Sequence, residues 1–353
     1  MNRLELLYAK MMFRLNTEKR MSICRKLASL LRNDFTLIDA LERIEMIESK
    51  NGTKPNEPFA IVMRQWQKNL ERGMTFSEAT RGWVPPNETL LVTSGNLSNL
   101  VVALENVGRV VDGMQRIRRA MTTAVAYPLF LLALTFGIII MVGLYLVPPL
   151  AEIATNDIVW RGSARSLIWL SDVSIKYWYV FLVVAASVIG VVWISLPNWS
   201  GRVRSMFDKF APWSIYKIQV SSGWLMSLAA MVSAGVTIPD AMRMLSDSSN
   251  KYVSRILDSA LRYIANGDNL GVALTNTKMD FPDSEIIGDL IIYADMNGFD
   301  ENLTRIANDY LNESVRKMEK ISNILNGLGI VLVSVIIAWV VLGTFQMQDQ
   351  IIN

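Results

Sequence analysis

The sequence predicts an all-α membrane protein with two homologous cytoplasmic helical bundles and three transmembrane helices. The 353-residue chain is 51% hydrophobic, and its mean hydropathy of +0.28 is high for a soluble protein. Three uncharged apolar stretches are each long enough to cross about 30 Å of hydrocarbon as a helix. Two large polar segments share a sequence motif and lack strand-like alternation of apolar and polar residues, so we expect helices in both.

The shared motif stands once in each polar segment. The first segment, residues 1–122, contains LASLLRNDFTLIDA at 27–40, and the second, residues 197–326, contains LAAMVSAGVTIPDA at 228–241. The two copies are identical at five of fourteen positions. Apolar residues recur at helical spacing in the first half of each copy, which predicts a helix with one apolar face, then a turn and a second helix.

The turn in each copy has residues that stop one helix and start the next. Gly235 is expected to adopt the left-handed conformation that ends a helix, and Asn33–Asp34 does the same in the first copy. In both copies a threonine at the N-cap position precedes an aspartate by three residues. The negative charge of the aspartate interacts favourably with the unpaired N–H groups of the first helical turn and so stabilises the start of the helix. The cap residues are Thr36, Asp39, Thr237 and Asp240.

Two further blocks repeat in the same order. GMTFSEA at 73–79 corresponds to GDNLGVA at 267–273, and SGNLSNLVVALENV at 94–107 corresponds to YADMNGFDENLTRI at 293–306. Three blocks in register indicate that a whole domain was duplicated. Each copy is therefore expected to form a helical bundle that leads into a membrane span.

The three spans are expected at residues 123–147, 178–196 and 327–346. Tyr127–Pro128 lies at the membrane entrance of the first span, where the proline either kinks the helix or occupies its start. Pro148–Pro149 is expected to end that span.

Basic residues cluster beside the spans, and the positive-inside rule places these clusters in the cytoplasm. The N-terminus is then cytoplasmic, and residues 148–177 and the tail 347–353 are periplasmic. We expect no cleavable signal peptide, because the N-terminal residues mix charged and apolar side chains. The clusters are Arg116, Arg118 and Arg119 before the first span, Arg202, Arg204 and Lys209 after the second, and Arg316, Lys317 and Lys320 before the third.

Composition excludes several kinds of catalysis. The chain contains no histidine, and Cys24 is its only cysteine, so histidine-dependent nucleophilic catalysis and zinc sites of histidine or clustered cysteine are excluded. There is no phosphate-binding loop, and a net charge of +3 gives no reason to expect a nucleic-acid partner. We therefore expect no enzymatic activity, no cofactor and no metal site. A transporter or channel subunit is the main alternative, which the charge-free spans disfavour, and a membrane-tethered signalling scaffold is another.

Taken in order, the repeated blocks resemble the type II secretion F family, the inner-membrane platform proteins of type II secretion and type IV pilus assembly. The little sequence ahead of the first bundle resembles the compact versions in bundle-forming and conjugative pilus systems. The resemblance implies a scaffold without enzymatic activity. It also implies three partners: a hexameric cytoplasmic assembly ATPase, prepilin or pilin subunits, and other inner-membrane assembly proteins. Glycines at 137, 143, 327 and 329 would permit close helix contact, which suits a further partner, other copies of the chain. The motifs are LAAMVSAGVTIPDAM (228–242), GDNLGVA, Phe281–Pro282, ADMNGFDENL (294–303) and AVAYP (124–128).

The resemblance also suggests candidate contact residues. Asp295 matches an acidic residue of the family's third block, whereas its first-repeat counterpart is Asn96. Asp295 is a candidate partner contact, and the alternative is that both residues cap a helix or loop. The basic helix 105–122 is a candidate transmission element, and it can also anchor to anionic lipid. Its arginines are Arg109, Arg116, Arg118 and Arg119.

Overall fold

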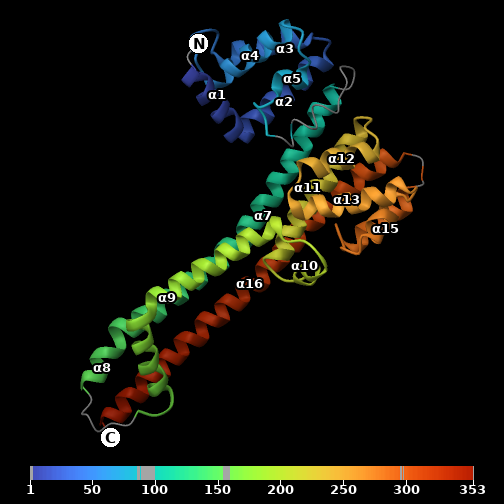
Figure 1. The fold of residues 1–353 in the computed structure, drawn as a ribbon. Coiled ribbons are helices and arrows are strands. Elements are labelled where there is room, and N and C mark those ends of the chain that lie inside the picture. The colour runs from blue at the N-terminus through green and yellow to red at the C-terminus, as the bar shows by residue number, and fades with distance from the viewer. Residues whose placement is uncertain are drawn as a thin grey trace. The chain divides into compact units, whose positions relative to one another are not determined.

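The fold is described from a computed structural model, which covers residues 3–85, 88, 100–153, 160–294, 296 and 298–352. Regular structure in these residues is helical, and three helical segments are long and apolar enough to cross a membrane, which confirms the predicted fold class. The chain divides into two compact units (Figure 1). The bundle unit contains Met1–Ile117 and Pro197–Ser314, and the span unit contains Arg118–Leu196 and Val315–Asn353.

The first bundle is built around aromatic side chains from three helices. The Phe13 ring centroid lies 5.4 Å from that of Phe59 and 5.3 Å from that of Trp66, and Trp66 lies 5.7 Å from Phe76. Phe13 lies on α1, Phe59 and Trp66 lie on α4, and Phe76 lies on α5, so these ring contacts pack the three helices together. The helices of this bundle are α1 (Arg3–Leu15), α2 (Thr17–Arg32), α3 (Leu37–Glu48), α4 (Pro58–Glu71) and α5 (Phe76–Thr80).

A buried ion pair also holds the first bundle together. Arg20 on α2 is buried, and its Nε and Nη2 atoms donate to the two carboxylate oxygens of Glu88 at 2.7 and 2.6 Å. The third nitrogen, Nη1, donates to the carbonyl oxygens of Phe13 and Arg14, both at 2.8 Å. Fork-shaped pairing of this kind satisfies both charges, so removing one partner would leave the other buried and unpaired.

The second bundle has its own aromatic centre. The Phe281 ring centroid lies 5.4 Å from that of Trp224 and 6.3 Å from that of Tyr252. The helices of this bundle are α10 (Arg202–Phe207), α11 (Trp213–Ser233), α12 (Ile238–Ser248), α13 (Lys251–Ala265), α14 (Leu270–Asn276) and α15 (Ser284–Ala294).

The first two repeated blocks have left-handed residues at equivalent positions in both bundles. Asp34 and Gly235 occupy equivalent positions of the first motif, and both are left-handed, with φ of 62° and 89°. Gly73 and Gly267 are equivalent in the second block, with φ of 84° and 99°. Aspartate is among the few non-glycine residues that tolerate this conformation, so the same turn forms with Asp34 in the first copy and Gly235 in the second.

The repeat continues into the membrane segments. Helix α7 (Leu100–Met141) continues through the π-helical η2 (Val142–Leu146) into α8 (Val147–Ile153), and α16 spans Phe299–Ile352. Leu100 of α7 and Phe299 of α16 are equivalent residues of the third block, so the two long helices follow the repeat in the same register. The duplicated unit therefore includes the first and third spans, and the second span, within α9 (Gly162–Asn198), lies between the copies.

The prediction that Pro148–Pro149 ends the first span is wrong, because the helix continues to Ile153. The π-helical η2 ends immediately before α8, so both prolines occupy the first turn of α8, where a missing N–H costs little. Pro128 lies inside α7 rather than at a helix start.

Within the span unit, α9 packs closely against α16 and the π-helical turn. A Cβ atom at Gly343 of α16 would lie 2.2 Å from Cδ1 of Leu167 on α9, so any larger residue there would force Leu167 to move. The Ser171 hydroxyl of α9 donates to the Gly143 carbonyl oxygen of η2 at 2.6 Å. This bond pairs a buried backbone acceptor in the irregular turn, which would otherwise be unsatisfied.

Candidate functional site

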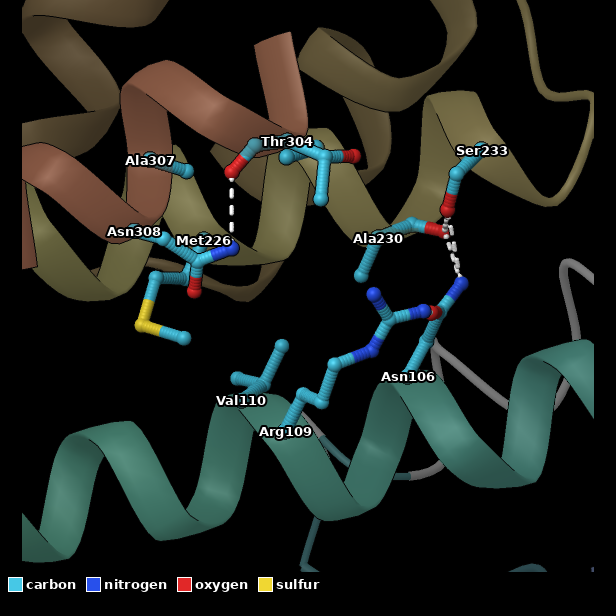
Figure 2. A pocket seen from close by; sticks show the side chains of 10 residues that line it. Asn106, Arg109, Val110, Met226, Ala230, Ser233, Thr304, Ala307 and Asn308 are labelled. Carbon is cyan, nitrogen blue, oxygen red and sulfur yellow. Dashed lines mark hydrogen bonds between the residues drawn. The ribbon is translucent and has the colours of Figure 1, made fainter. Parts of the chain in front are cut away.

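Helix α7 contributes side chains to both bundles. Leu104 and Val107 pack in the first bundle, where they line a small cavity with Leu27 and Trp66. Asn106 and Val110, on another face of α7, line a pocket with residues of the second bundle (Figure 2). We call this contact of α7 with α11 and α16 the junction; its residues are Asn106, Arg109, Val110, Gly113, Met114 and Arg116 of α7, Gly223, Met226, Ala230 and Ser233 of α11, and Ala307, Leu311 and Asn312 of α16.

Asn106 makes the main polar contact of the junction. Its side-chain amide nitrogen donates to the Ala230 carbonyl oxygen at 2.9 Å and to the Ser233 hydroxyl at 2.7 Å (Figure 2). Its side-chain oxygen accepts from the Arg109 guanidinium. Asn106 is buried, so these bonds replace the water that its amide would otherwise need.

Two glycines let α7 and α11 approach closely. A Cβ atom at Gly113 would lie 2.6 Å from both Sδ and Cε of Met226, and 3.0 Å from Cδ2 of Leu311. A Cβ atom at Gly223 of α11 would lie 2.9 Å from Sδ of Met114 on α7. Each helix thus places a methionine over a glycine of the other, and methionine fills such irregular gaps because its chain is flexible.

Hydroxyl groups join α11 to α16 beside the junction. The Ser221 hydroxyl lies 2.8 Å from the Tyr310 hydroxyl, and the Ser222 hydroxyl donates to that of Ser314 at 2.9 Å. These groups are buried, and burial raises the pKa of the Tyr310 hydroxyl above its ordinary value. Tyr310 is therefore neutral at physiological pH and acts as a hydrogen-bonding group of the core.

Charged pairs join α7 to α2 of the first bundle. The Arg32 guanidinium contacts the Glu105 carboxylate, and Arg25 Nη2 lies 3.9 Å from Asp112 Oδ1. These pairs are solvent-exposed, so each contributes only about 0–1 kcal/mol. The apolar contacts of Leu104 and Val107 hold α7 to the first bundle more strongly than these charges do.

The candidate transmission residues fall in two places. Arg109 and Arg116 lie at the junction, where Arg116 Nη2 donates to the Asn312 side-chain oxygen on α16 at 2.9 Å. Arg118 and Arg119 lie beyond it, in the span unit, and are exposed. Asp295 and Asn96 lie outside the described residues.

The predicted cap residues lie at the starts of two equivalent helices. Thr36 is the N-cap of α3 and accepts a hydrogen bond from the Asp39 backbone N–H. Thr237 is the N-cap of α12 and accepts from the Asp240 backbone N–H. Gly235 occupies the turn before α12. The membrane-entrance residue Tyr127 is exposed on α7 next to Pro128.

Sequence reasoning named Arg109 and Arg116 but missed the other residues of the junction. Asn106 follows a mostly apolar run at 100–104, and a polar residue in such a stretch is a signal for a buried hydrogen bond. Gly113 and Gly223 gave no signal, since neither ends a helix nor belongs to a repeated block.

The pocket at the junction is small. Its volume of about 20 Å³ has room for a water molecule and is too small for an organic ligand. Among the described residues, no group of three His, Cys, Asp or Glu side chains is arranged to hold a metal ion. The junction therefore joins helices and is not a small-molecule site.

A comparison of the sequence with protein-family profiles identifies the family of the chain. The sequence profile of the family described as type II secretion system (T2SS), protein F matches residues 23–148 and 224–346. The chain belongs to this family. A comparison with curated proteins gives no significant match. Each matched range contains part of one bundle and much of one long helix, so the family domain occurs twice in this type II secretion F protein.

Membership defines the general role of the protein. Type II secretion F proteins are membrane platform proteins of type II secretion and type IV pilus systems. Together with three candidate spans, this makes the chain a multi-pass inner-membrane protein.

Proposed function

We propose that this platform protein couples a cytoplasmic assembly ATPase to the extraction of pilin from the membrane and to its assembly into a filament. The bundles would bind the ATPase on the cytoplasmic side, and the spans would contact pilin subunits in the bilayer. Further copies of the chain and other inner-membrane assembly proteins would complete the platform.

One observation carries this proposal: α7 packs in both bundles, and the same helix contains the residues of the proposed first span. A displacement of either bundle therefore acts on a helix that also forms the first span. Helix α16 does the same for the second bundle and the third span. A helix maintains its backbone hydrogen bonds along its length, so it transmits displacement better than a loop would.

The proposed orientation follows the distribution of basic residues, with both bundles in the cytoplasm and the C-terminus in the periplasm. Cysteine labelling in intact cells tests it. A membrane-impermeant maleimide should label a Gln348→Cys variant before permeabilisation and an Arg262→Cys variant only afterwards, since both positions are exposed. The reverse pattern would overturn the orientation.

The coupling role is tested by photo-crosslinking in living cells. A photoreactive amino acid at the exposed bundle positions Met46 or Arg262 should capture the assembly ATPase. The same probe at the exposed span positions Val183 or Val335 should capture pilin. Capture of neither partner from any of these positions would contradict the proposal, and solute flux through proteoliposomes of the purified chain would favour a transporter instead.

A further inference from the structure

Helix α10 and the residues after it have an inverted distribution of polar and apolar side chains. Val203, Met206 and Phe207 lie on one side of α10, and Phe210 follows in the turn after it; we call these four apolar residues the stripe. Their exposed fractions are 58%, 68%, 41% and 66%. The charged Arg204 and Asp208 lie on the opposite face and are buried. In water the reverse distribution is stable, so the stripe needs an apolar environment, which either lipid or another protein surface would provide.

Buried polar contacts hold the stripe outward. Arg204 is 0% exposed, and its Nη1 lies 2.7 Å from Asp208 Oδ1. The guanidinium carbon lies 4.9 Å from the ring centroid of Tyr252 on α13, whose hydroxyl donates to Asp208 Oδ2 at 3.0 Å. These contacts fix α10 against the second bundle and set the direction in which the stripe points.

The segment also follows the second span directly. The candidate span Ile175–Asn198 ends one residue before Trp199, so residues after it begin at the membrane surface. The rings of Trp199 and Trp213 each have their centroids 5.2 Å from that of Phe207. Tryptophan is enriched at the boundary between lipid headgroups and hydrocarbon, which is the depth where this chain segment starts.

We propose that residues 199–213 form a membrane wedge, in which the stripe of Val203, Met206, Phe207 and Phe210 inserts into the leaflet next to the bundle unit. The partner is a lipid surface with anionic headgroups. Arg204 and Asp208 pair with each other in the interior, so the exposed Lys209 is available to anionic headgroups, and the sequence places a further basic residue, Arg202, in the segment. Amphipathic segments of this kind insert about 5–10 Å into the headgroup and acyl boundary. The wedge would fix the second bundle to the bilayer surface through Arg204 and Asp208.

Fluorescence quenching by lipid tests the wedge in the full-length protein. Met206→Cys and Phe210→Cys variants are labelled with an environment-sensitive NBD maleimide and placed in nanodiscs of phosphatidylcholine and phosphatidylglycerol. Native Cys24 need not be removed, because it is buried and its thiol is not in the reactive thiolate form at neutral pH. Arg262→Cys, exposed on α13 of the same bundle, is the matched control, and Val183→Cys in the second span is the positive control.

The wedge predicts that lipid carrying a nitroxide near the headgroup quenches NBD at Met206→Cys and Phe210→Cys and leaves Arg262→Cys unquenched. A nitroxide near the end of the acyl chain should quench these two positions less than Val183→Cys. NBD emission typical of water at both positions would overturn the proposal. Apolar emission without quenching by either lipid would also overturn it and would indicate that another protein copy or partner covers the stripe.

Discussion

Replacing Gly113 of α7 by alanine tests the close packing of the junction. A Cβ atom there would lie 2.6 Å from the Met226 side chain and 3.0 Å from Leu311. Overpacking of this kind costs about 1–3 kcal/mol, because neighbouring side chains must leave their preferred rotamers. Alanine also gains about 1 kcal/mol over glycine in helix propensity, so the net expectation is about 0–2 kcal/mol of destabilisation.

Gly108 provides the matched control on the same helix. No heavy atom lies within 4 Å of a Cβ atom at Gly108, so Gly108→Ala should gain the propensity without the clash. The two variants should therefore differ in stability by about 1–3 kcal/mol, with Gly108→Ala the more stable. Thermal unfolding of the purified protein in detergent, followed by tryptophan fluorescence, measures the order. Equal stabilisation by both substitutions would refute the close approach of α7 and α11.

Three further results are expected. Glu88→Ala should destabilise the first bundle by about 3–5 kcal/mol, since it leaves the buried Arg20 charge unpaired. The double variant Arg20→Met/Glu88→Leu should recover much of this loss, because it removes both charges. Equal unfolding midpoints for the single and the double variant would contradict this expectation. Ser171→Ala should cost about 1–3 kcal/mol by leaving the Gly143 carbonyl unpaired, whereas Ser187→Ala, whose hydroxyl bonds only within its own helix, should have little effect on detergent stability. Burial, reinforced by the Glu88 carboxylate, raises the pKa of Cys24 from 9.0 to about 12. The thiol should therefore resist maleimide in the native protein and react once the protein is unfolded, and rapid labelling of the native protein at neutral pH would contradict this. Because the thiol ionises at lower pH in the unfolded chain, the stability of the fold should decrease as pH rises from about 9 toward 12.

The local features of the fold were predictable because they depend on neighbouring residues. Thr36 and Thr237 cap helices through N–H groups three residues away, so the motif alone indicates them. The equivalence of Asp34 and Gly235 follows from the register of the repeat. The spans were recognisable because length and lack of charge are sufficient signals for a membrane helix.

Contacts between distant segments were not predictable from the sequence. Asn106 bonds to Ala230 across 124 positions, and no local pattern specifies that pairing. Arg204 was interpreted only as a positive-inside residue, but the second bundle buries it against Asp208. The prediction that Pro148–Pro149 ends the helix failed because a π-helical turn precedes these prolines. Such a turn changes where a helix can accept proline, and it has no clear sequence signal.

The most direct test of the account compares filament assembly or secretion in cells carrying Gly113→Leu or Val102→Leu at equal membrane abundance. The account predicts that Gly113→Leu abolishes output, because leucine separates α7 from α11 at the junction. It predicts that Val102→Leu retains output, because Val102 is exposed on the same helix. Equal output from the two variants would contradict the claim that the junction carries motion from the bundles to the membrane.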